Sequence, residues 1–299
     1  MVSTSSNLSS HTASAQLGGV SNADNVLSPI DVLPVELMLK IFSYLNGPTL
    51  VNCQGVSVKW RRLAGDPSFE KKIQLYHTLE ILRAQGNFID ERAWKLLGDI
   101  GEVPPLPDNI LEELMKPCPF WNPERTADGK KVKDTHVLGL MVDKVNGEPV
   151  TLTSIERCAS TPKEGGHATR FEQVYEDILK DHGETAVGKP YWALMTAKII
   201  PDIQGKSKKG KLAMAANFGY EAPTLLQAIA FNIVRYVSTK KRLFIGGRLF
   251  AGKPWLGTYC LEKSGSSKLA VVSFLFFGLN VSYTHIDDDR IGVAAVRKF

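Results

Sequence analysis

The chain contains few of the features that mark secreted, membrane or metal-binding proteins. Only four of its 299 residues are cysteines, at positions 53, 118, 158 and 260, and no two form a CxxC pair typical of zinc sites. Such scattered thiols indicate a reducing compartment such as the cytosol. No apolar run reaches the roughly 18 residues that a membrane-spanning helix needs. We therefore expect no transmembrane segment and no zinc.

Basic residues are missing from the N-terminal region, where Lys40 is the first lysine or arginine. Without a basic segment followed by an apolar one, the sequence predicts no Sec-type signal peptide. Residues 1–28 are rich in Ser, Thr, Asn, Ala and Gly, and they hold too little apolar surface to offset the entropy of ordering them. We expect a disordered tail at 1–28, and a non-cleaved export signal for a bacterial secretion apparatus is an alternative interpretation.

The chain has neither a strongly basic nor a strongly acidic overall charge. Its 36 lysines and arginines against 31 acidic residues give a net charge of +5, which permits nucleic-acid binding without indicating it. The densest basic run, Lys206 to Lys211, is interleaved with glycine and serine. This composition favours a solvated loop over a phosphate-binding patch, and we expect no nucleic-acid partner.

Repeats and known catalytic signatures are also missing. The sequence has no leucine-rich, WD or kelch spacing, and no HExxH, GxSxG or kinase motif. The segment from Gly246 to Lys253 resembles half of a phosphate loop, but Pro254 follows where the motif needs serine or threonine. Asp287, Asp288 and Asp289 favour a turn over a cation site, because Arg290 adjoins them. The sequence therefore predicts neither cofactor nor metal.

Two cysteine–histidine pairs are the remaining candidates for catalysis. Cys260 and His285, with one of Asp287 to Asp289 to orient the histidine, follow the chain order of some thiol hydrolases. No family signature surrounds Cys260, which lies in a predicted strand. The second pair, Cys158 and His167, is predicted on a helix and in a glycine-rich loop. We favour a non-catalytic protein and keep an enzyme of unknown activity as an alternative.

One predicted helix, over 34–45, is apolar around most of its circumference. Its polar residues Glu36, Lys40 and Ser43 form a single narrow stripe at 3.6 residues per turn. Such a helix needs cover on two sides, and the short segments after it supply one. We expect a second helix to begin at Pro48 or Thr49 and a third to be capped by Ser57. The uncovered side of the first helix is then free to bind a second protein.

The same stretch resembles an F-box, through LPVEL at 33–37, IFSYL at 41–45, and then Leu50, Cys53, Val56, Trp60 and Leu63. The resemblance implies a three-helix module over 29–72 that docks on the Skp adaptor of a cullin–RING (SCF) ubiquitin ligase. It also implies which residues contact Skp. These are Leu33, Pro34, Leu37, Ile41, Phe42, Leu45, Leu50, Val56, Trp60 and Leu63.

The rest of the chain is predicted as a helical connector followed by a mixed domain. Residues 73–116 carry an amphipathic helix up to Gly86, a helix over 91–97 capped by Asp90, and a stiff proline spacer at 104–107. In 117–299 we expect helices at 152–159, 170–181, 209–218 and 223–238, the last amphipathic and central. We expect strands at 136–142, 191–200, 242–244, 255–261, 269–283 (as one strand or two) and 291–297. The predicted fold class is multidomain, mostly α and then α+β, with a largely antiparallel sheet.

The C-terminal half resembles an uncharacterised domain that follows F-boxes in proteins of chlamydia-like bacteria. The similarity lies in HVLGLMVDKVNGEPVTLTSI, PKEGGHATRFEQVY, YWALMTAKIIP and IGVAAVRKF. It implies an exported effector that acts in the cytosol of a eukaryotic host, and it implies no chemistry. A eukaryotic F-box protein of unknown class is the alternative origin. The sequence thus predicts an adaptor that binds Skp and presents a protein held by 117–299. A Skp-binding scaffold or sequestering protein, and an F-box-tethered enzyme, are the alternatives.

Overall fold

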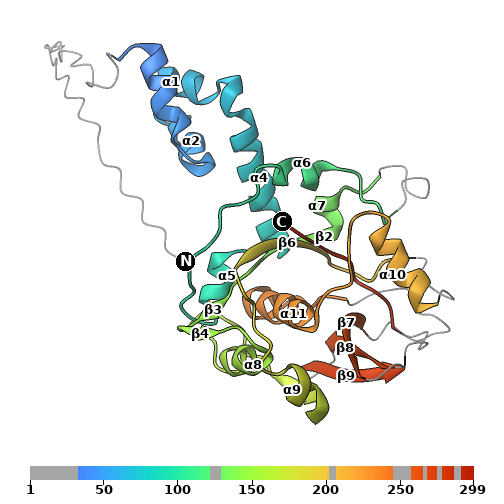
Figure 1. Cartoon of the computed structure of the whole chain (residues 1–299). Coiled ribbons are helices and arrows are strands. Elements are labelled where there is room, and N and C mark those ends of the chain that lie inside the picture. The colour runs from blue at the N-terminus through green and yellow to red at the C-terminus, as the bar shows by residue number, and fades with distance from the viewer. Residues whose placement is uncertain are drawn as a thin grey trace, which may run out of the picture. The chain divides into compact units, whose positions relative to one another are not determined.

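The computed structural model describes residues 33–121, 129–201, 207–244, 257–264, 268–274, 278–285 and 291–299, so the expected tail at 1–28 lies outside the described residues. The chain divides into a first unit, Met1–Asp66, and a second unit, Pro67–Phe299. Figure 1 shows both units with their elements labelled. No helix among the described residues combines the length and the apolar character needed to cross a membrane.

The first unit contains three short helices, as the sequence predicts: α1 (Val35–Ser43), α2 (Gly47–Cys53) and α3 (Val58–Ala64). Side-chain caps start the last two. The Asn46 side chain accepts a hydrogen bond from the Thr49 amide at 3.0 Å, and the Ser57 hydroxyl accepts one from the Trp60 amide at 3.1 Å. The starts of α2 and α3 are therefore set by local side-chain caps, whereas α1 begins after Pro34 without one.

The core of the first unit is small and is formed between α3 and the two helices before it, both of which contact α3. The ring of Phe42 meets that of Trp60 edge to face, with 5.4 Å between the centroids. The fully or nearly fully buried apolar side chains are Met38, Phe42, Leu50, Cys53, Leu63 and Ala64.

The second unit contains two four-stranded sheets and a short hairpin. The first sheet has the order β1 (Phe88–Ile89), β2 (His136–Met141), β6 (Tyr191–Thr196), β10 (Val296–Lys298), and only β1 and β2 run parallel. The second has the order β5 (Phe171–Val174), β9 (Leu279–His285), β8 (Lys268–Phe274), β7 (Thr258–Ser264), and only β5 and β9 run parallel. The hairpin joins β3 (Lys144–Val145) to β4 (Glu148–Pro149). The expected fold class, helical and then α+β with largely antiparallel sheets, is confirmed.

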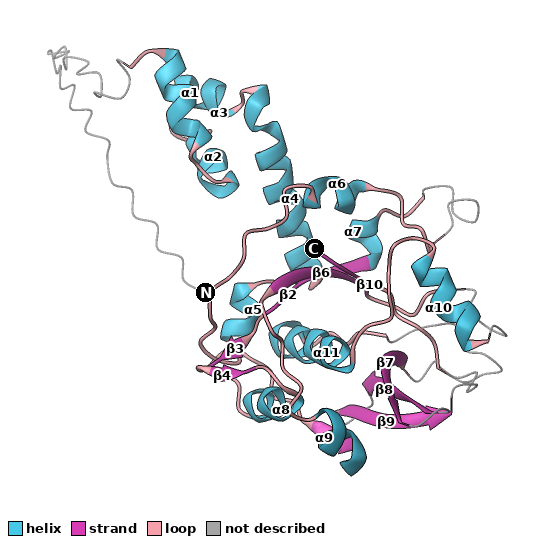
Figure 2. Ribbon diagram, in the orientation of Figure 1, coloured by secondary structure: helices cyan, strands magenta, loops and turns pink. Residues whose placement is uncertain are grey.

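A long helix, α11 (Leu225–Thr239), lies between the two sheets (Figures 1 and 2). It begins at a capping box in which the Gln227 amide donates to the Thr224 hydroxyl at 3.2 Å and the Thr224 amide donates to the Gln227 side chain at 2.8 Å. The helix is central, as predicted, but it is buried on nearly every side instead of on one amphipathic face. Helices α5 (Glu91–Lys95) and α8 (Leu152–Ser160) contact α11. The other helical elements described in the second unit are the 3-10 turn Pro67–Phe69, α4 (Glu70–Gln85), α6 (Ile110–Met115), α7 (Val132–Thr135), α9 (Glu176–His182) and α10 (Lys208–Ala216).

The contact between α11 and the first sheet depends on Gly139 of β2. A Cβ atom at this position would lie 2.4 Å from the Phe231 ring of α11. We expect Gly139→Ala to lower the free energy of unfolding of the second unit by about 1–3 kcal/mol, because the buried ring has to move. Urea unfolding monitored by circular dichroism measures this. Gly188→Ala is the matched control, since a Cβ there meets no atom within 4 Å. Equal stability of the two variants would contradict the proposed close contact.

Several predicted elements differ from those observed. The helix expected over 170–181 is divided, because Phe171–Val174 pairs with β9 and only Glu176–His182 is helical. Residues 242–244 form no strand, since the Leu243 amide donates to the Asn232 side chain at 3.0 Å and the Phe244 amide to the Ala197 carbonyl at 3.0 Å. In 291–297 the strand begins only at Val296. The stretch 269–283 forms two strands, β8 and β9, which is one of the two predicted alternatives. The strand expected at 255–261 starts at Thr258 within the described residues.

The expected connector, 73–116, belongs to the core of the second unit in this structure. Its residues Phe88 and Ile89 form β1, which pairs with β2, and the Trp94 indole donates to the Leu140 carbonyl at 2.7 Å. The segment Pro104–Pro107 packs against the first sheet and accepts a hydrogen bond from Trp192 at 2.9 Å, so it is no free spacer. The connector residues therefore share the hydrophobic core with 117–299.

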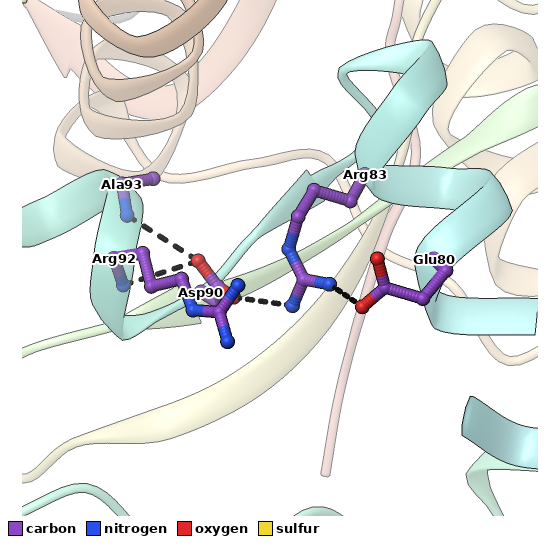
Figure 3. Close-up of polar contacts among 5 residues, drawn as sticks. All are labelled: Glu80, Arg83, Asp90, Arg92 and Ala93. Carbon is purple, nitrogen blue, oxygen red and sulfur yellow. Dashed lines mark hydrogen bonds and ion pairs between the residues drawn. The ribbon is translucent and has the colours of Figure 1, made fainter. Parts of the chain in front are cut away.

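An ion-pair network joins α4 to α5 in this region (Figure 3). The Arg83 guanidinium donates to Asp90 at 2.7 Å and to Glu80 on its own helix. The other oxygen of Asp90 accepts from the amides of Arg92 and Ala93, at 3.1 and 3.3 Å, and so caps α5 as predicted. Burial of Arg83 opposes its charge, but the two carboxylates outweigh that effect and raise the pKa of the guanidinium.

Candidate docking site for a partner protein

Helix α1 presents three different faces. Met38 and Phe42, four residues apart, are buried in the first unit. Leu37, Ile41 and Tyr44 follow the spacing i, i+4, i+7 and are 49%, 40% and 78% exposed. We call these three residues the exposed stripe. The remaining face carries the polar residues Glu36, Lys40 and Ser43, all of which are exposed. The helix is therefore covered on one apolar side and open on the other, as its pattern predicts.

Further apolar side chains of the first unit are also exposed. Val35, Val56 and Val58 are 49%, 61% and 73% accessible. Together with the exposed stripe they make six of the eleven exposed large hydrophobic residues in the described part of the chain. Single exposed hydrophobic residues are normal, but six fall within 24 residues of sequence, 35–58, which makes this the part of the described chain richest in exposed apolar side chains.

The ten residues predicted to contact Skp fall into three groups in the structure. Pro34, Leu37, Ile41 and Val56 are exposed, and Leu33, Leu45 and Trp60 are half-buried. The other three are only 1%, 0% and 6% accessible and are therefore core residues; they are Phe42, Leu50 and Leu63. Skp contact by all ten residues stays a prediction, and for these three the structure adds a second role in the core of the first unit.

Sequence reasoning missed three exposed residues, Val35, Tyr44 and Val58. The signal for Tyr44 was present, because it lies seven residues after Leu37 and so continues the same stripe. Val35 and Val58 stand at the first positions of α1 and α3, where the sequence carries no sign of which apolar residues are covered.

The first unit, Met1–Asp66, has no net charge, because its four lysines and arginines are matched by four acidic residues. Two of the acidic residues, Asp24 and Asp31, lie outside the described residues. Lys40 and Arg62 are exposed, while the Arg61 side chain donates to the Gln54 carbonyl at 3.1 Å and so ties α3 to the turn before it.

The structure does not bring Cys260 and His285 together. Cys260 lies in β7 and His285 at the end of β9, with β8 between them, which alone separates the two strands by roughly 10 Å. The register adds a displacement along the strands, because His285 lies across β8 from Ser264 and not from Cys260. Burial, together with the nearby carboxylate of Glu262, raises the pKa of the Cys260 thiol and disfavours the nucleophilic thiolate. Burial likewise raises the pKa of Cys158. The candidates Asp287 to Asp289 and the segment from Gly246 to Lys253 lie outside the described residues.

The basic run is not the solvated loop that the sequence predicts. Its residues from Lys208 onward belong to α10, and Lys211 is only 2% accessible. The Lys211 ammonium donates to the Ile291 carbonyl at 3.1 Å and lies 5.6 Å from the centre of the Tyr259 ring. Lys211 therefore anchors α10 to the second unit. Within the described ranges, no group of three or more histidine, cysteine or acidic side chains is placed to hold a metal ion.

Comparison with known proteins supports the interpretation of the first unit. Residues 30–75 match the family model named F-box-like, close to the predicted range 29–72. No curated protein and no solved structure matches the chain, and the resemblance of the C-terminal half to a domain of chlamydia-like bacteria stays a prediction. The chain thus carries an F-box-like domain at 30–75, which supports a general role as an adaptor that binds a Skp-type partner.

Proposed function

We propose that this protein is a non-catalytic substrate adaptor of an SCF-type ubiquitin ligase, in which the first unit binds Skp and the second unit holds a protein for ubiquitination. The observation that carries the proposal is the exposed stripe of α1, within the range that matches the F-box-like family. The contribution of such an adaptor is proximity, because it raises the effective concentration of target lysines at a conjugating enzyme bound elsewhere in the ligase. The resemblance of the C-terminal half further favours an exported effector acting in host cytosol.

The test replaces two residues of the exposed stripe by charged ones, in the variant Leu37→Asp with Ile41→Asp. We expect affinity for a Skp adaptor to fall by roughly 100-fold or more, because two apolar anchors at the centre of an interface become charges without partners. Binding of purified proteins by calorimetry measures this. Both side chains are at least 40% exposed, so the first unit should stay folded, which circular dichroism verifies.

Ser43→Asp provides the matched control, since it adds a carboxylate to the polar face of the same helix. Its affinity for Skp should remain within about threefold of the parent protein. Undiminished binding of the double variant would overturn the proposal. A loss of equal size in Ser43→Asp would show that added negative charge, and not the exposed stripe, controls binding.

The same double variant distinguishes presentation for ubiquitination from scaffolding. Cells that express the parent protein are compared by proteomics with cells that express the double variant. Accumulation of a specific protein only with the variant supports presentation of that protein to the ligase. An unchanged proteome favours a Skp-binding scaffold or sequestering protein.

A further inference from the structure

His136, the first residue of β2, is the most completely buried histidine among the described residues. It is 0% accessible, and its ring lies beside those of Phe120 and Tyr220, with 6.2 and 5.4 Å between the ring centroids. The Phe120 and Tyr220 rings meet each other edge to face at 5.2 Å, and both residues are buried. We call these three residues the His136 cluster. Each of its rings therefore contacts the other two.

One ring nitrogen of His136 has a hydrogen-bond partner and the other has none. Nδ1 lies 2.9 Å from the Thr135 hydroxyl, which itself donates to the Val132 carbonyl at 3.2 Å. A hydroxyl has a single hydrogen, so its oxygen accepts from Nδ1, and we assign the Nδ1–H tautomer. Nε2 then carries a lone pair, is buried, and has no partner among the described residues. A proton added at Nε2 would create a buried charge without an acceptor.

Two carboxylates lie on the helices before β2, and both are already paired. The two oxygens of Glu113, in α6, accept from Lys116 at 2.7 Å and from Arg297 at 2.9 Å. The two oxygens of Asp134, in α7, accept from the Lys133 ammonium at 2.9 Å and from a backbone amide at 3.0 Å. Neither carboxylate is therefore free to neutralise a protonated His136.

The other titratable groups near the cluster supply no negative charge either. Burial raises the pKa of Tyr220 to about 12, so its phenol stays neutral; the nearby Arg297 opposes this shift, and Cys118 and Glu113 add to it. Arg297 adds positive charge to this region, which disfavours a second cation.

Among the elements that pack on β2, β1 has no titratable side chain, and β6 has only Tyr191, which pairs with the opposite end of β2. Helix α11 carries Tyr236, which stacks on the second sheet, and Arg235, which is bonded to three acceptors elsewhere. These elements thus offer no anion to His136.

We propose that His136 is an acid-sensitive lock: the closed His136 cluster excludes a proton from Nε2, so acid favours an opened form of the second unit in which Phe120 and Tyr220 no longer cover the ring. Histidine suits this role because its ordinary change of charge falls between pH 5 and 8. For an adaptor, the unit that holds the target would be most stable near neutral pH. That consequence rests on the proposed function, whereas the acid response itself does not.

The pH response of His136 has a definite sign. Burial lowers the pKa of its imidazole to about 3, against a smaller opposing effect of the Val132 carbonyl. In the opened form the imidazole regains its ordinary pKa of about 6.5. The opened form therefore takes up the proton first. The stability that His136 contributes is complete above about pH 6.5 and is lost as the pH falls toward 3, by about tenfold in the opening constant for each pH unit.

Urea unfolding of the full chain at pH 7 and at pH 5, at one ionic strength and monitored by circular dichroism, measures the response. The test variant is His136→Gln, because an amide is not protonated in this range but still donates a hydrogen bond. From pH 7 to pH 5 the unfolding constant of the second unit should rise about 25-fold more in the parent than in His136→Gln. An equal rise in the two proteins would overturn the proposal.

His182→Gln and His77→Gln are the matched controls. The Nε2 atom of His182 is also buried without a partner, but the residue as a whole is only half-buried, and His77 is exposed. Both variants should respond to pH as the parent does. Loss of the response in His182→Gln, with the response kept in His136→Gln, would assign the lock to the wrong residue. Loss of Skp binding has no bearing on these outcomes.

Nuclear magnetic resonance of the parent keeps the proposal testable if His136→Gln fails to fold. In the folded protein at pH 5, the ring nitrogens of His136 should give the signals of a neutral imidazole with its proton on Nδ1. A protonated His136 in the folded protein at this pH would contradict the lock.

Discussion

Replacing Phe42 by alanine is expected to unfold the first unit while the second unit stays folded. Truncating a buried phenylalanine costs about 3–5 kcal/mol. Phe42 is 1% accessible and packs edge to face on Trp60, so its removal leaves a cavity between α1 and α3. A unit this small has little stability in reserve, because its core consists of a few side chains. Binding of Skp should disappear as a consequence of unfolding and not of a lost contact.

Hydrogen exchange followed by mass spectrometry measures the protection of backbone amides in each unit separately. Peptides from 33–66 should lose their protection in Phe42→Ala, and peptides from β2 and α11 should keep theirs. Tyr44→Ala is the matched control, since it truncates an aromatic residue of the same helix that is 78% exposed. Its stability should change by no more than about 0.5 kcal/mol. Full protection of 33–66 in Phe42→Ala would show that Phe42 is not a core residue.

Replacing Arg235 by methionine is expected to destabilise the second unit by more than about 3 kcal/mol. Arg235 is 8% accessible and donates to the Gly86 carbonyl at 2.7 Å, the Asn87 side chain at 2.8 Å and the Arg242 carbonyl at 3.0 Å. Burial lowers the pKa of this guanidinium to about 10, so it is still charged at neutral pH. Methionine fills a similar volume but leaves three acceptors without a donor, each of which costs about 1–3 kcal/mol.

Urea unfolding of the full chain, monitored by circular dichroism, measures the loss. Arg235→Lys should fall between the parent and Arg235→Met, because a single ammonium cannot reach three acceptors that point in different directions. Arg92→Met is the matched control, since the Arg92 side chain is exposed in the same unit. An Arg235→Met protein as stable as Arg92→Met would contradict the bridging role of Arg235.

The parts of the fold that the sequence predicted correctly are those determined by nearby residues. Ser57 and Asp90 cap helices through amides two or three positions away, so their role is visible in the local sequence. The region 171–174 was predicted wrongly because its conformation is set by β9, more than a hundred residues further on. The two-residue strand β1 is too short to leave any periodicity, and with it the place of 73–116 in the core was missed.

In the candidate site too, the local sequence does not predict a feature that is set by packing against another element, and here this occurs within a single helix. Leu37 and Met38 are chemically alike, yet one is 49% exposed and the other is completely buried. In a helix that is apolar on most sides, the sequence locates the polar face but does not distinguish the covered apolar face from the open one. That distinction depends on where α3 packs, which only the structure shows.

The position of β10 has a consequence for how the protein folds. Strand β10, residues 296–298, forms one edge of the first sheet and pairs with β6, which lies about a hundred residues earlier in the sequence. Strand β1 forms the other edge and lies about a hundred residues before β6. Pairings between such distant residues make folding slow, because the loops must close before the contacts form. During synthesis the first unit can fold as soon as residue 66 has left the ribosome. The second unit can complete its sheet only when residue 298 has emerged, and until then the edge of β6 that β10 covers stays unpaired and open to aggregation.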